Sequence, residues 1–219
     1  MEEEIGIETV KARSVRGIVV LTGRTFLLQI IGLVAQLFLF AYLGKYEFGV
    51  FAIVSAIISF LVYFSDIGLA AALIQKKEKP TELDLKTTFT VQQILVFILI
   101  GVVLLLTPFF VSKYSLNSDG KMLLYALSAS LVLSSFKSIP SVLLERKLEF
   151  VKLVFPQILE QIVYNVVLVV MAMKGAGLAS FSVAVLVRGV VGLAALYFIQ
   201  PWKPGIAFSL STIKGLFKF

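Results

Sequence analysis

Six apolar runs, each about as long as a bilayer is thick, constrain this chain more than any other feature. A membrane-spanning helix needs about 20 predominantly apolar residues, and the runs cover residues 18–43, 48–74, 89–111, 122–144, 153–173 and 178–199. Hydrophobic residues make up 59% of the 219 residues and charged residues only 15%, whereas soluble domains carry about 25% charged residues. The sequence therefore predicts an all-α, polytopic membrane protein that folds as a bundle of six transmembrane helices.

The basic residues between these runs predict how the bundle is oriented. Thirteen of them fall on one side and four on the other. The larger set is Lys11, Arg13, Arg16, Lys76, Lys77, Lys79, Lys86, Arg146, Lys147, Lys152, Lys203, Lys214 and Lys218, and the smaller set is Lys45, Lys113, Lys121 and Lys174. Because lysine and arginine favour cytoplasmic loops, we expect a multi-pass protein of the plasma (inner) membrane with both termini in the cytoplasm.

The two ends of the chain are expected to lie outside the bilayer. Residues 1–17 are predicted to form a polar cytoplasmic segment that precedes the first helix. Residues 200–219 mix leucine, isoleucine and phenylalanine with lysines, which is typical of an amphipathic tail that lies in the membrane interface.

The absence of two residue types excludes several kinds of chemistry. The chain contains no cysteine and no histidine, so it has no thiol nucleophile, no imidazole base and none of the usual zinc ligands. We therefore expect no catalytic residue, no metal and no cofactor, and a protein that is not an enzyme. Its net charge of +7 lies mostly between the apolar runs, where contacts with anionic lipids explain it better than binding of nucleic acid.

Five charged residues lie inside the predicted spans: Arg24, Asp66, Lys137, Glu160 and Arg188. At a rise of about 1.5 Å per residue, they lie roughly 9 to 16 Å from the cytoplasmic ends of their helices. Charged residues within a membrane usually face a cavity or pair with one another. Five such residues on five helices at similar depth predict one polar cavity that opens toward the cytoplasm.

Amide side chains follow the same helices and are predicted to line this cavity. They are Gln29 and Gln36 in the first span and Gln157 and Gln161 in the fifth. Simpler interpretations stay open for the charges. The Arg24 side chain could extend to the interface, and Asp66 with Arg24, or Glu160 with Lys137, could form structural ion pairs. Asp66 could also couple transport to an ion.

The predicted cavity contains three cations and two acids. Arginine and lysine hold phosphate groups by charge-assisted hydrogen bonds. This balance favours an anionic group such as a phosphate or pyrophosphate over a cationic drug, and Arg188, Lys137 and Arg24 are the candidate substrate-binding residues.

Three stretches resemble a known family. They are LGKYEFGVFAIVSAIISFLVYFSDIGLAAALIQKK, SIPSVLLERKLEFVKL and QPWKP, in that order along the chain. Together they resemble the polysaccharide-transport (Wzx-type O-antigen or oligosaccharide flippase) branch of the multidrug/oligosaccharidyl-lipid/polysaccharide exporter superfamily, over nearly all 219 residues. Asp66 lies in the FSD segment of the first stretch.

The resemblance implies both a fold and a function. Members of this branch have two similar lobes, and this chain would be the N-terminal lobe of a MATE-like exporter, with residues 200–219 leading into a second lobe. They move oligosaccharides linked to undecaprenyl pyrophosphate to the outer leaflet by alternating access, which requires both repeats. The implied partners are the lipid-linked oligosaccharide, membrane lipids and components of a glycan polymerase or ligase.

Three other functions remain open from the sequence. A cation-coupled multidrug exporter of the same superfamily would favour a cavity dominated by acids. A membrane enzyme that acts on polyprenyl phosphates would need clustered carboxylates or a histidine base, and the acids here are scattered. A helper that does not transport, but docks to a glycan-assembly complex, is the third alternative.

Overall fold

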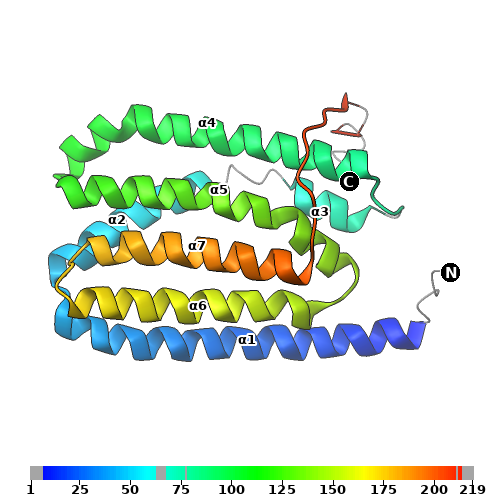
Figure 1. The fold of residues 1–219 in the computed structure, drawn as a ribbon, viewed down its shortest axis with the longest axis horizontal. Helices are drawn as coiled ribbons and strands as arrows, with labels where there is room; N and C mark the ends of the chain where they lie inside the picture. The colour runs from blue at the N-terminus through cyan, green and yellow to red at the C-terminus, as the bar shows by residue number, and fades with distance from the viewer. Residues whose placement is uncertain (1–6, 63–67, 77, 211, 214–219) are drawn as a thin grey trace.

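The computed structural model describes residues 7–62, 68–76, 78–210 and 212–213, with side chains from residue 17 onward. Within these residues the chain forms seven α-helices and no strand (Figure 1). They are α1 (Ile7–Tyr42), α2 (Lys45–Val62), α3 (Leu69–Gln75), α4 (Glu82–Tyr114), α5 (Ser118–Arg146), α6 (Phe150–Met173) and α7 (Ala179–Ile199).

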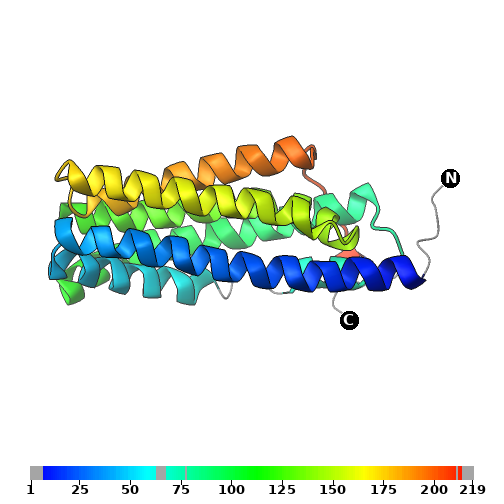
Figure 2. The ribbon, with the colours of Figure 1, turned by 90° about the horizontal axis from the view of Figure 1, so that it is seen from below.

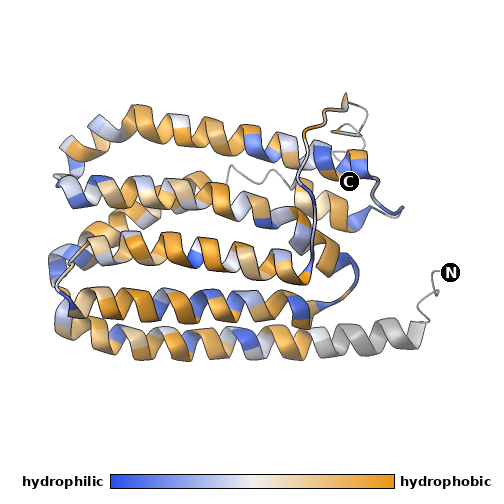
Figure 3. Ribbon diagram, viewed as in Figure 1, coloured by the Kyte–Doolittle hydropathy of each residue, from blue (hydrophilic) through white to orange (hydrophobic). Residues whose placement is uncertain are grey.

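Six of the described helices, all except α3, are long and apolar enough to cross a membrane. They lie side by side along one common direction in both views (Figures 1 and 2). Figure 3 shows hydrophobic residues along the helices and hydrophilic residues gathered toward the ends of the bundle. The prediction of a helical, multi-pass membrane protein with six apolar helices is confirmed.

The second apolar run differs from its prediction as a single helix over 48–74. Helix α2 ends at Val62, and the short α3 begins at Leu69 after Gly68, whose φ is 79°. A helix cannot continue through a residue with left-handed φ, and glycine adopts that conformation with little cost. The predicted cavity residue Asp66 falls within 63–67, outside the described residues.

Helix α4 begins with a capping box at Thr81. The Thr81 side chain accepts a hydrogen bond from the Asp84 backbone N–H, and the Asp84 carboxylate accepts one from the Thr81 backbone N–H. This exchange satisfies two backbone donors that a helix start leaves unpaired. Helix α4 then runs without a break to Tyr114, so residues 82–88, which precede the predicted span over 89–111, form its first turns.

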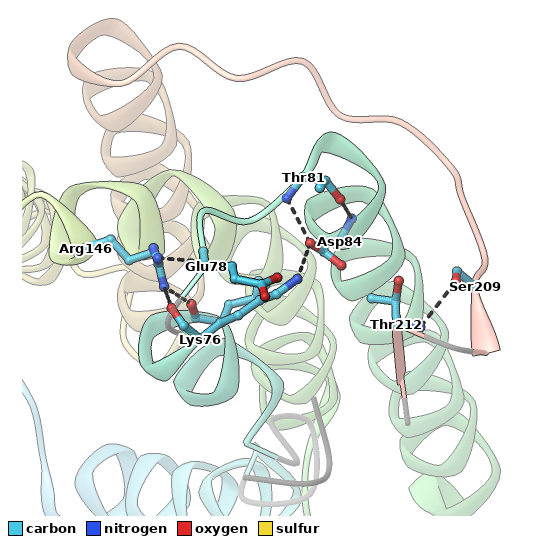
Figure 4. A network of polar contacts seen from close by, with 8 residues as sticks. Lys76, Glu78, Thr81, Asp84, Arg146, Ser209 and Thr212 are labelled. Atoms are coloured by element: carbon cyan, nitrogen blue, oxygen red, sulfur yellow. Dashed lines mark hydrogen bonds and ion pairs between the residues drawn. The ribbon is translucent and has the colours of Figure 1, made fainter. Parts of the chain in front are cut away.

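The segment between α3 and α4 is held by one arginine and one ion pair (Figure 4). The Arg146 guanidinium, at the end of α5, donates to the backbone oxygens of Leu73, Ile74 and Lys76 at 2.6 to 2.9 Å. It also donates to the Glu78 oxygen at 3.0 Å. These oxygens belong to the end of α3 and the chain after it, which lack helical partners of their own. Lys76 Nζ in turn lies 2.7 Å from Asp84 Oδ2.

The core of the bundle draws its buried residues from α2, α4, α5, α6 and α7, with Leu39 of α1. Within this core the ring of Phe181 stacks on that of Phe51, with centroids 4.2 Å apart. A second cluster joins α3 to α4, α5 and Trp202 at the other end of the bundle. Helix α1 packs along α6 at the edge, and only 6% of its membrane-length apolar window is buried.

Candidate functional site: a cationic cavity among four helices

A polar cavity of about 290 Å³ opens between α1, α5, α6 and α7. Charged and amide side chains share its wall with a few apolar ones. The lining residues are Arg24, Leu28, Lys137, Ser141, Leu153, Pro156, Gln157, Glu160, Gln161, Arg188 and Leu196. Lys137, Glu160 and Arg188 each lie roughly 14 to 16 Å along their helices from the same end of the bundle. The cavity therefore lies within the membrane-length part of the fold.

Glu160 is the central residue of the charged cluster. Its side chain is 8% exposed, and its Oε1 accepts a hydrogen bond of 2.7 Å from Lys137 Nζ. Its Oε2 lies 3.5 Å from Nε of Arg188, whose side chain is 44% exposed. A buried carboxylate is stable only when it is paired and hydrogen-bonded. One acid on α6 thus ties together cations from α5 and α7.

Helix α7 leaves room for this carboxylate at Gly192. A Cβ atom built at position 192 would collide with the Cγ, Cδ and Oε1 atoms of Glu160. Gly192 lies one turn after Arg188, so both residues lie on the face of α7 that meets Glu160. From the sequence, this glycine is only one of several small residues that suit helix packing, and its spacing of four from Arg188 is the one signal that marks it.

Arg24 joins the cluster from α1. Its Nη1 donates a hydrogen bond of 2.6 Å to Gln157 Oε1 on α6. Its Nε is buried and has no hydrogen-bond partner within the described part of the chain. The pairing of Arg24 with Asp66 that the sequence left open concerns a residue outside the described ones.

Arg188 has a second contact that the sequence did not indicate. Its guanidinium carbon lies 5.6 Å from the centroid of the Tyr164 ring on α6, over the ring face. Such a cation–π contact orients an arginine while leaving its outer N–H groups available. Because the Arg188 side chain is half-exposed, those donors are accessible from the cavity.

The structure brings together six of the residues that the sequence predicts to share a cavity: Arg24, Lys137, Gln157, Glu160, Gln161 and Arg188. It does not bring the two glutamines of the first span there. Gln29 and Gln36 are exposed on α1 and do not line this cavity. At 3.6 residues per turn they point roughly 120° to 140° away from Arg24 around the helix axis. They belong to a separate polar stripe that faces away from α6.

The described lining residues carry three cations and one acid. Glu160 neutralises part of the charge of Lys137 and Arg188, and the partner of Arg24 within the described part of the chain is a neutral amide. An excess of positive charge with free N–H donors, in a site of low dielectric constant, favours an anion with several oxygens.

Comparison with known proteins gives one result. The family model described as "Polysaccharide biosynthesis protein" matches residues 39–219, which include Lys137, Glu160 and Arg188 but not Arg24. Neither a curated protein nor a solved structure matches the chain. Because the matched residues cover most of its length, this chain belongs to the polysaccharide biosynthesis protein family.

Proposed function

We propose that this chain is the N-terminal lobe of a flippase for a lipid-linked oligosaccharide. Its substrate would be a saccharide on undecaprenyl pyrophosphate, which moves from the cytoplasmic to the outer leaflet during synthesis of a surface polysaccharide. Family membership supports a role in polysaccharide biosynthesis. The observation that carries the proposal is the cluster of Arg24, Lys137 and Arg188 around Glu160 in a cavity within the bundle.

In this proposal the cations bind the pyrophosphate that links the sugar to its lipid. Arg188 and Lys137 donate to phosphate oxygens from α7 and α5, and Arg24 donates from α1. Without a ligand, the Glu160 carboxylate takes the place of the phosphate, since its two oxygens face Lys137 and Arg188. Pyrophosphate binding then competes with Glu160, so the site can release its ligand again instead of trapping it.

The expected orientation would place this cavity in the cytoplasmic half of the membrane. The ends of α5 and α7 and the beginnings of α4 and α6 lie at one end of the bundle (Figures 1 and 2). Arg146, Lys147, Lys152 and Lys203 belong to this end. With that end in the cytoplasm, the cavity would receive a substrate from the inner leaflet, and rocking against a second lobe would provide alternating access.

A cation-coupled drug exporter is less well supported. Such a site would need a carboxylate free to bind a cation. Among the described lining residues Glu160 is the one acid, and both of its oxygens already face cations of the chain.

The test is complementation in a strain that lacks the complete protein carrying this chain. Arg188→Ala and Lys137→Ala should each lower surface polysaccharide about tenfold or more, since each removes a charge-assisted hydrogen bond. Lys113→Ala, at the opposite end of the bundle, is the control and should export normally. Protein abundance is measured by immunoblot. Normal export with both cavity variants, at unchanged abundance, would refute the phosphate site.

A further inference from the structure

A second hollow, unlike the first in chemistry, lies on the seam between α1 and α6. Its volume is about 470 Å³ and its wall is almost entirely apolar. The lining residues are Ile30, Ile31, Val34, Ala35, Ile162, Asn165, Val166, Val169 and Val170. It is called the α1–α6 groove below.

The one amide in the α1–α6 groove does not make it polar. Asn165 is buried, and its Nδ2 donates to the Gln161 backbone oxygen at 2.9 Å. In contrast, Ile30, Val34, Ile162 and Val166 are exposed. Their side chains line an open, purely hydrocarbon surface, which in a bilayer fits a lipid chain rather than a polar ligand.

The groove continues from the cationic cavity along both helices. On α1, Leu28 lines the cavity and Ile31, three residues on, lines the groove. On α6, Gln161 lines the cavity and Asn165, four residues on, lines the groove. Residues three or four apart are neighbours on a helix surface, so the groove starts one turn beyond the cavity. It then follows α6 for about 12 Å, from Ile162 to Val170.

The order of the two sites matches the order of groups in a lipid phosphate. The cations lie nearer to the end of the bundle where α7 ends, and the groove lies farther into the membrane-length part. A lipid whose phosphate enters the cavity between α1 and α6 has its hydrocarbon chain directed into the bilayer along that same seam. The cations of the cavity would bind the phosphate end of this ligand. The apolar wall of the groove would bind its hydrocarbon end.

We infer that the α1–α6 groove binds the prenyl chain of the lipid whose pyrophosphate the cavity holds. This inference rests on the proposed function and extends it to the lipid half of the substrate. The lipid-linked substrate would then bind this lobe along the seam between α1 and α6.

The experiment compares two ligands, inorganic pyrophosphate and undecaprenyl pyrophosphate, on the protein in phosphatidylcholine nanodiscs. Val166→Trp fills the groove, and Ile30→Trp fills it from the opposite wall. Val190→Trp on α7 is the matched control, because Val166 and Val190 are both 56% exposed and Val190 is outside the groove. Dissociation constants are measured by displacement of radiolabelled pyrophosphate, in identical nanodiscs so that lipid partitioning cancels.

Each groove variant should raise the Kd of the prenyl ligand about tenfold, since a few buried methylene groups are lost. Each should leave the Kd of inorganic pyrophosphate unchanged, and Val190→Trp should change neither value. Equal Kd values for the prenyl ligand in Val166→Trp, Ile30→Trp and Val190→Trp would overturn the inference while leaving the phosphate site intact. No pyrophosphate binding to the unaltered protein would overturn the phosphate site and this inference with it.

Discussion

The carboxylate of Glu160 occupies the space that a side chain at position 192 would need. A Cβ atom at Gly192 would overlap the Glu160 Cγ, Cδ and Oε1 atoms. The absent side chain therefore allows an acid of α6 to reach between Lys137 of α5 and Arg188 of α7. Charge pairing and close helix packing depend on each other at this point.

Gly192→Ala should consequently lower the stability of the bundle. The added methyl group forces either Glu160 or α7 to move, and overpacking of this kind costs about 1–3 kcal/mol. The matched control is Gly101→Ala in α4, where nothing lies within 4 Å of the built Cβ and alanine favours a helix. Thermal unfolding in detergent should show a lower Tm for Gly192→Ala only. Equal Tm values for both variants would mean that Glu160 relaxes freely and that the close approach has no energetic role.

Glu160→Gln should make the protein less stable without an anion and more responsive to one. The neutral amide leaves Lys137 and Arg188 without their carboxylate. Loss of one partner of a fully buried pair costs about 3–5 kcal/mol, and the cost is smaller here because Arg188 is half-exposed. Pyrophosphate should replace the lost charge, because it no longer competes with an internal anion.

The measurement is the rise in Tm on adding pyrophosphate to each variant. A ligand present at 100 times its Kd stabilises a protein by about 2.7 kcal/mol, so tighter binding appears as a larger rise. Glu160→Gln should show a larger rise than the unaltered protein, and Glu160→Gln combined with Arg188→Ala should lose it. A smaller rise in Glu160→Gln would show that Glu160 helps the anion to bind instead of competing with it.

The sequence was sufficient to predict six long apolar helices and to place Lys137, Glu160 and Arg188 at a similar depth. A long apolar run is stable in a bilayer as a helix, which pairs all its backbone groups internally, so six helices could be predicted from the number and length of the apolar runs. Lys137, Glu160 and Arg188 could be placed at one depth because the rise per residue is fixed. Their contact across three helices is consistent with that estimate.

Features that depend on backbone conformation or on helix rotation could not be predicted in this way. Gly68 looks like any small residue in an apolar run, and its positive φ, which separates α3 from the preceding helix, appears only in the structure. Gln29 and Gln36 have the helical spacing of a cavity-lining stripe, but the rotation of α1 against α6 exposes them. The spacing of polar residues shows which of them share one face of a helix, but it does not show which neighbouring helix that face meets.

Arg146→Lys should loosen the end of α3. A lysine ammonium has three donors on one atom, whereas the Arg146 guanidinium reaches the backbone oxygens of Leu73, Ile74, Lys76 and Glu78. At least one or two of these bonds should be lost, at about 1 kcal/mol each. The Lys76 amide, which donates to the Ala72 oxygen, should exchange with deuterium about tenfold faster or more.

Lys147→Ala is the control for this variant, since Lys147 Nζ bonds only a glutamine side chain, Oε1 of Gln200, at 3.3 Å among the described contacts. Its exchange at Lys76 should match that of the unaltered protein. Unchanged exchange in Arg146→Lys would show that apolar packing of Leu69 and Leu73 holds α3 without the arginine.

The 219 residues contain no cysteine, so a cysteine introduced among them is unique within this sequence and can report the orientation of the bundle. Lys147→Cys lies between α5 and α6, and Lys113→Cys lies in the last turn of α4 at the opposite end. With thirteen basic residues expected on one side against four on the other, the positive-inside rule predicts that position 147 faces the cytoplasm. In intact cells a membrane-impermeant maleimide should label Lys113→Cys and not Lys147→Cys, and both should react after the cells are opened. The reverse pattern would put the cationic cavity in the outer half of the membrane, where it could receive a lipid phosphate only after transport.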